Sequence, residues 1–150
     1  MIVATVAHLL KRWAGSLNRR PIPEDQRAVV STLLTPSEYG LWQAMRIEDR
    51  RHSLIVYRRY RSLRPLGARA EYAAALLHDV GKVAADIGTF ARVLATLVGP
   101  RGARFRAYHD HEALGSAMAE DIHADPLTVA MIRGDGPAEL MDALARADMY

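Results

Sequence analysis

The spacing of apolar residues is the feature of this sequence that most constrains its fold. Apolar side chains recur three and four positions apart along most of the chain, which is the spacing of one helix face, and no segment shows a persuasive strand-like alternation. Prolines and glycines separate these segments. The sequence therefore predicts an all-α fold of about eight or nine helices without an internal repeat.

Capping residues mark where several of these helices begin. Thr35 before Pro36 is typical of an N-cap followed by a first-turn proline, and Glu38 completes a capping box. Asp125 before Pro126 marks another start in the same way. The helices that we expect cover residues 24–34, 36–46, 48–63, 68–77, 90–98, 109–122, 126–132 and 137–149, in addition to one within residues 1–20.

Residues 1–20 are expected to form an N-terminal amphipathic helix and a linker, and residues 24–150 one further domain. The apolar face of the first helix can pack on its own domain, join two copies in a homodimer or lie on a membrane surface. Lys11 and Arg12 follow the apolar stretch, which is the reverse of a secretory signal, and no later run approaches the length of a membrane span. We therefore expect a cytoplasmic protein without a transmembrane segment.

Composition limits the chemistry that the chain can carry. Its 150 residues, 50% of them hydrophobic, are enough to fold without a structural metal, because a domain of this size buries about two thirds of its unfolded surface. The chain has no Cys, so only His, Asp and Glu remain as metal ligands. A net charge of +3 is too small to argue for a nucleic-acid partner.

His78 and Asp79 are the most informative polar residues. They end an apolar run, and Gly81 and Lys82 follow closely. Neighbours on a helix point about 100° apart, so two adjacent ligands can bind one ion only from a helix end or a distorted turn. Gly81 supplies such an end. The sequence therefore predicts an imidazole, a carboxylate and an ammonium together at a helix C-terminus.

Four segments of the chain resemble motifs of one protein family, in the family's order. The run His78-Asp79-Val80-Gly81-Lys82 resembles the signature of the HD-domain superfamily of metal-dependent phosphohydrolases, in the form found in HD-GYP and related domains. The other three are similar to the family's first ligand helix, its later His-x-x-x-Gly segment and its closing helix; they are Asp49-Arg50-Arg51-His52-Ser53-Leu54, His111-Glu112-Ala113-Leu114-Gly115 and Arg146-Ala147-Asp148-Met149-Tyr150.

The resemblance implies an HD-type helical bundle in which four side chains converge on one divalent cation per chain. These implied ligands are His52, His78, Asp79 and Asp148. Two imidazoles and two carboxylates form a mixed nitrogen and oxygen set that suits Mn, Fe, Co, Ni, Zn or Mg. The expected site is thus a metal centre with positions left for water.

The same resemblance implies hydrolysis of a phosphate ester. A bound cation lowers the pKa of its water, which then attacks phosphorus, and Asp79 anchors that water while also being a ligand. Lys82 stabilises negative charge on a phosphate oxygen, and the alternative for it is a solvated lysine at a helix end. His111 is expected to contact substrate. Arg51 is a candidate for steering phosphate, although an ordinary solvated arginine is the more common case.

Two departures from the family pattern narrow the function. Dinuclear relatives carry a His-His pair before the last aspartate, but residues 131–137 contain no histidine, and the GYP signature is also absent. We therefore expect a single metal and a metal-dependent phosphohydrolase that acts on a nucleotide or another small phosphate ester. The alternative is a catalytically degenerate HD domain that serves as a nucleotide-sensing or protein-binding module.

Overall fold

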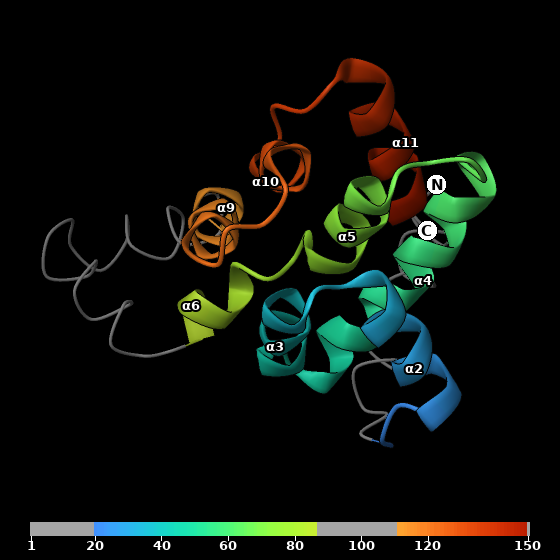
Figure 1. The fold of residues 1–150 in the computed structure, drawn as a ribbon, viewed down its shortest axis with the longest axis vertical. Helices are drawn as coiled ribbons and strands as arrows, with labels where there is room; N and C mark the ends of the chain where they lie inside the picture. The colour runs from blue at the N-terminus through green and yellow to red at the C-terminus, as the bar shows by residue number, and fades with distance from the viewer. Residues whose placement is uncertain (1–19, 87–110, 150) are drawn as a thin grey trace, which may run out of the picture.

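The computed structural model describes residues 20–86 and 111–149, and these residues form an all-helical bundle without a strand, which confirms the predicted fold class (Figure 1). The helices expected within residues 1–20 and 90–98 lie outside the described residues. The described helices are α2 (Glu24–Leu33), α3 (Pro36–Ala44), α4 (Ile47–Leu63), α5 (Arg69–Leu77), α6 (Lys82–Asp86), α9 (His111–Asp121), α10 (Pro126–Arg133) and α11 (Ala138–Asp148). None of these helices is long and apolar enough to cross a bilayer.

Helix α5 lies in the middle of the bundle. Its residues from Ala73 to Leu77 have 0% of their surface exposed. A helix that is apolar on every side must be covered on every side, and α2, α3, α4 and α10 pack against it (Figure 1). Helix α11 packs on α4, whereas α9 packs on α10 and α6. The C-terminal end of α5 therefore lies between the pair α4 and α11 on one side and the group α6, α9 and α10 on the other.

The expected helix starts are confirmed in detail. Thr35 accepts a hydrogen bond from the backbone N–H of Glu38, whose carboxylate accepts one from the N–H of Thr35 in return. Asp125 accepts from the N–H of Leu127 at 2.8 Å and begins α10. Gly134 ends that helix with a φ of 90°, the left-handed conformation that glycine adopts without strain.

Helix α6 differs from the expectation that Gly81 would interrupt helical structure until residue 90. The chain passes from α5 through a tight turn in which Val80, Lys82 and Val83 donate backbone hydrogen bonds to carbonyls three positions earlier. Such hydrogen bonds give a tighter turn, with about three residues instead of about 3.6, and they keep the right-handed sense of the helix. Helix α6 therefore begins at Lys82, directly after the turn.

A buried carboxylate joins α4 to α5. Glu71 is 5% exposed and accepts hydrogen bonds from the hydroxyl of Tyr60 at 2.7 Å, from Nε of Arg64 at 3.1 Å and from the N–H of Ala68 at 3.0 Å. Burial alone raises the pKa of Glu71, but these hydrogen bonds outweigh it, so the pKa lies below its ordinary value. The ionised carboxylate therefore stabilises the packing of the two helices.

We expect Glu71→Gln to lower the free energy of unfolding by about 1–3 kcal/mol at neutral pH, because donors that face the carboxylate lose a charged acceptor. The control is Glu139→Gln, which removes the exposed second partner of Arg64 and should change stability little. Urea unfolding of both variants measures the difference.

The acid dependence of stability checks the same contact. Because the pKa of Glu71 is lower in the folded state, its contribution is present above about pH 4.3, the ordinary glutamate pKa, and is lost as the pH falls through the folded value. The gap in stability between wild type and Glu71→Gln should therefore narrow in acid. A gap that stays constant down to the acid transition would contradict this assignment.

Candidate metal centre

Three of the four expected ligands come together from three separate elements. His52 lies on α4, His78 follows the last residue of α5, and Asp148 is the last residue of α11. One potential ligand atom from each lies within 4.8 Å of the other two. Nε2 of His52 is 2.7 Å from Oδ1 of Asp148, and Nε2 of His78 is 3.6 Å from the same oxygen. These atoms form a compact group of two nitrogens and one oxygen.

Contacts on either side of His52 fix how α4 faces α11. The next residue, Ser53, is fully buried; its hydroxyl accepts a hydrogen bond from Nε1 of Trp42 at 3.0 Å and donates one to the carbonyl of Arg50 at 2.8 Å. Two turns further along α4, Arg59 donates to the carbonyl of Ala147 at 3.4 Å. The rotation of α4 and the position of the last turn of α11 are thus both set by hydrogen bonds outside the centre.

The orientation of His78 leaves one ring nitrogen without a hydrogen-bond partner. Its Nδ1 lies 2.8 Å from the carbonyl oxygen of Ala75, and because a carbonyl only accepts, Nδ1 carries the proton. In the neutral ring Nε2 then presents a lone pair. This buried Nε2 makes no hydrogen bond, and it lies 3.5 Å from Oδ2 of Asp79 and 3.6 Å from Oδ1 of Asp148. A lone pair that faces two carboxylates requires a positive charge between them, either a proton or a metal cation.

The electrostatics of the group favour such a positive charge. Burial lowers the pKa of His78, but the nearby carboxylates of Asp148 and Asp79 outweigh it, so the pKa is raised. The hydrogen bond with His52, together with the nearby imidazole of His78, holds the pKa of Asp148 well below its ordinary value. Burial raises the pKa of Asp79, but the charges of His78 and Lys82 reverse this effect and lower it. Both carboxylates are therefore ionised at neutral pH.

Asp79 stands at the edge of the group and is held by Lys82. Its Oδ2 accepts a hydrogen bond from Nζ of Lys82 at 2.7 Å, and the same Oδ2 is the atom that lies 3.5 Å from His78. Nζ also lies 3.8 Å from Oδ1 of Asp49 on α4. Lys82 is thus paired with two carboxylates, while its side chain stays 39% exposed.

One side of the centre is open to solvent. The side chains of His78 and Asp79 are only 12% and 9% exposed, whereas those of His52, Lys82 and Asp148 are 35%, 39% and 47% exposed. The buried pair fixes the geometry, and the other three side chains face outwards where a small ligand can reach them.

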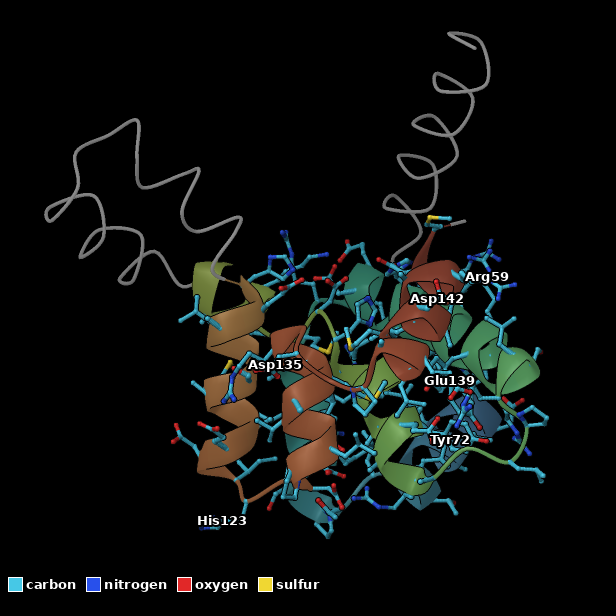
Figure 2. The ribbon with its side chains drawn as sticks, turned by 90° about the horizontal axis from the view of Figure 1, so that it is seen from above. Arg59, Tyr72, His123, Asp135, Glu139 and Asp142 are labelled. Atoms are coloured by element: carbon cyan, nitrogen blue, oxygen red, sulfur yellow. The ribbon has the colours of Figure 1, made fainter. Side chains whose placement is uncertain are left out.

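Two other predicted residues do not belong to this group. Among the described residues, the ligand atoms that cluster do not include those of His111, which begins α9. The guanidinium of Arg51 donates to the backbone carbonyl of Arg20. Of the other histidines, His123 is exposed just after α9, at the opposite corner of the view in Figure 2 from Asp142 of α11. His8 and His109 lie outside the described residues.

Asp49 is the residue that the sequence interpretation missed as a member of the centre. In the sequence, Asp49 belongs to the segment around His52 that resembles the family's first ligand helix, but it was assigned no role of its own. Its position three residues before His52 places both side chains on neighbouring parts of one helix face, which is the signal that could have identified it. Its partner Lys82 comes from another helix, and that pairing depends on tertiary packing.

The turn that carries His78 and Asp79 packs tightly on the first turn of α9. A Cβ added to Gly81 would lie 1.7 Å from the carbonyl oxygen of His111 and 2.8 Å from the backbone nitrogen of Gly115. These neighbours are backbone atoms, which cannot rotate away as a side chain can. Glycine at position 81 therefore allows α9 to support the turn from behind.

We expect Gly81→Ala to destabilise the protein by more than about 2 kcal/mol, because two backbone segments must separate to make room. Gly40→Ala is the matched control: nothing lies within 4 Å of its added Cβ, and alanine in the middle of α3 should gain up to about 1 kcal/mol of helix propensity. Thermal unfolding of the two variants checks this, and equal stability would contradict the close packing of α9 on the turn.

Comparisons with known proteins give no match for this chain. Neither the protein-family models, nor the curated proteins, nor the solved structures contain one that matches it.

Proposed function

We propose that this protein is a metal-dependent phosphohydrolase of the HD type, with one divalent cation per chain, that acts on a nucleotide or another small phosphate ester. The observation that carries this proposal is the buried Nε2 of His78, which has no hydrogen-bond partner and faces two carboxylates. The motif resemblance supports the reaction class, because the residues of this group are those that the resemblance implies as ligands.

The donor set fits a divalent cation. Two neutral imidazoles and one or two carboxylates are a common ligand combination for Mn, Fe, Co, Ni and Zn. Ligand atoms that share one cation at bonds of about 2.1 Å lie at most about 4.2 Å apart. The distances from Oδ1 of Asp148 to Nε2 of His52, 2.7 Å, and to Nε2 of His78, 3.6 Å, are both below this limit. The hydrogen bond from Nδ1 of His78 to the carbonyl of Ala75 is also typical of a metal-binding imidazole, whose second ring nitrogen donates to a neighbouring acceptor and so fixes the ring.

Each residue of the group has a distinct part in such a reaction. His52, His78 and Asp148 would hold the cation, which when bound lowers the pKa of a coordinated water and withdraws charge from a phosphoryl oxygen. Asp79 lies beside this position and can orient the attacking water through its carboxylate. Lys82, which is 39% exposed, can offer an ammonium proton to a phosphate oxygen and stabilise the negative charge that develops there.

Metal content is the first test. We expect the purified protein, incubated with Mn²⁺ and freed of excess, to retain about one ion per chain, since three ligands suffice for a site with open positions. His78→Ala and Asp148→Asn should each lose it. Elemental analysis measures the ion, and a rise in melting temperature with Mn²⁺ provides a second measure, because a ligand at 100 times its Kd stabilises the folded state by about 2.7 kcal/mol.

Asp142→Asn is the matched control for the metal test. Asp142 is an exposed aspartate on the same helix as Asp148 (Figure 2), so its replacement removes the same charge from α11 without touching the group. This variant should keep the ion. If wild type, His78→Ala and Asp142→Asn all retain equal metal, or none, the proposed centre is wrong.

Hydrolysis of phosphate esters is the second test. We expect the Mn²⁺-loaded protein to release phosphate from an aryl phosphate or from one of a panel of nucleotides, and Lys82→Met to lower that rate by about 100-fold or more. Lys82→Arg, which keeps the charge, should retain more of it. Retention of the metal with metal-dependent nucleotide binding and no product would contradict the enzyme and favour the alternative, a nucleotide-sensing module.

A further inference from the structure

The ammonium of Lys82 is held from two directions by two different elements. Asp79, in the turn after α5, accepts its hydrogen bond at 2.7 Å, and Asp49, in the first turn of α4, faces it at 3.8 Å. The Asp49 side chain is 22% exposed and that of Asp79 is 9% exposed, so water screens neither ion pair fully. The oxygen that accepts this hydrogen bond, Oδ2 of Asp79, is also the one that lies 3.5 Å from Nε2 of His78.

With a divalent cation bound, the formal charges of the cation, Lys82 and the neighbouring carboxylates sum to zero only when Asp49 is included. Asp79 and Asp148 carry two negative charges, and a divalent cation would offset both of them. Lys82 adds a positive charge that would then repel the cation across a single carboxylate. Asp49 supplies the third negative charge, so that three carboxylates offset one ammonium and one divalent cation, with both imidazoles neutral. A buried or half-buried cluster favours such neutrality.

We propose that Asp49 is a positioning residue, which holds the Lys82 ammonium against Asp79 and thereby sets a fixed positive charge beside the metal centre. The role of this arrangement in catalysis rests on the proposed function, but the contact between Asp49 and Lys82 is present without metal or substrate. Because Asp79 is neutralised by an ammonium on one side, it needs no second metal there. The centre then offers two unlike cations to a phosphate group, one divalent ion and one ammonium.

The lysine content of the chain allows a direct test. Lys11 and Lys82 are its two lysines, so protein labelled with ¹⁵N-lysine gives at most two side-chain ammonium signals in an NMR spectrum, and Lys11→Arg identifies the signal of Lys82. An ammonium held by two carboxylates exchanges its protons with water slowly enough to be seen, whereas a free one is lost to exchange. We expect the Lys82 signal to be visible in the metal-free wild-type protein.

Variants of Asp49 distinguish a specific contact from a general field. Asp49→Asn should lose the Lys82 signal, and Asp49→Glu should restore it. Glu48→Gln is the matched control: it removes one negative charge from the same first turn of α4 and should leave the signal in place. The inference is overturned if Asp49→Asn keeps the signal, if Glu48→Gln loses it equally, or if the wild type itself shows free exchange, a result that needs no variant to fold.

Added metal separates this inference from the function on which it rests. An equimolar amount of Mn²⁺, which is paramagnetic, should broaden the Lys82 signal, because an ion bound by His52, His78 and Asp148 lies next to Asp79. A signal that is present, depends on Asp49 and does not broaden would contradict the metal centre while supporting the positioning role of Asp49. A signal that broadens but does not depend on Asp49 would support the metal centre and contradict the positioning role of Asp49.

Discussion

The complete burial of the second half of α5 is the constraint on which the rest of the structure depends. From Ala73 to Leu77 this helix offers no polar side chain and has no exposed surface, so other helices must cover it on all sides. A helix covered in this way can bring polar groups to the surface of the core only at its end. His78 and Asp79 occupy that end, and α4 and α11 approach there because they pack on each other beside α5. The location of the candidate centre thus follows from the packing of an apolar helix.

The polar groups at this end of α5 are arranged so that each buried charge has an opposite partner. Asp79 would be costly to bury alone, and Lys82, three residues later, compensates it within the same turn. Asp148 is compensated by the two imidazoles of His52 and His78. Nε2 of His78 is a buried nitrogen of this cluster that makes no hydrogen bond, although it lies 3.5 Å from Asp79 and 3.6 Å from Asp148.

Several helix starts could be predicted from the sequence, because they depend on local signals. Thr35 and Asp125 act as caps through hydrogen bonds to residues two or three positions away, and α5 ends at Leu77, as expected. The likeness to a known motif supplied the long-range pairing of His52 with Asp148, which no local signal contains.

The contacts that the sequence did not reveal are those between helices whose relative placement sets the distances. Asp49 meets Lys82 only because α4 and α6 lie at a particular angle and height in the bundle. Arg51 turns to the carbonyl of Arg20, an acceptor that every residue offers and that no side-chain pattern can identify. Helix α6 continues from the turn because backbone bonds span it, and side-chain identity carries little information about such bonds.

The bond between His52 and Asp148 joins positions 96 residues apart. Closing so long a loop costs conformational entropy, which the other contacts of the bundle must offset. An unfolded or half-folded chain would hold these two side chains far apart and would lack even a partial binding site. A cation that recognises the three ligands together would therefore bind the native state alone, and its affinity would report on the integrity of the whole bundle.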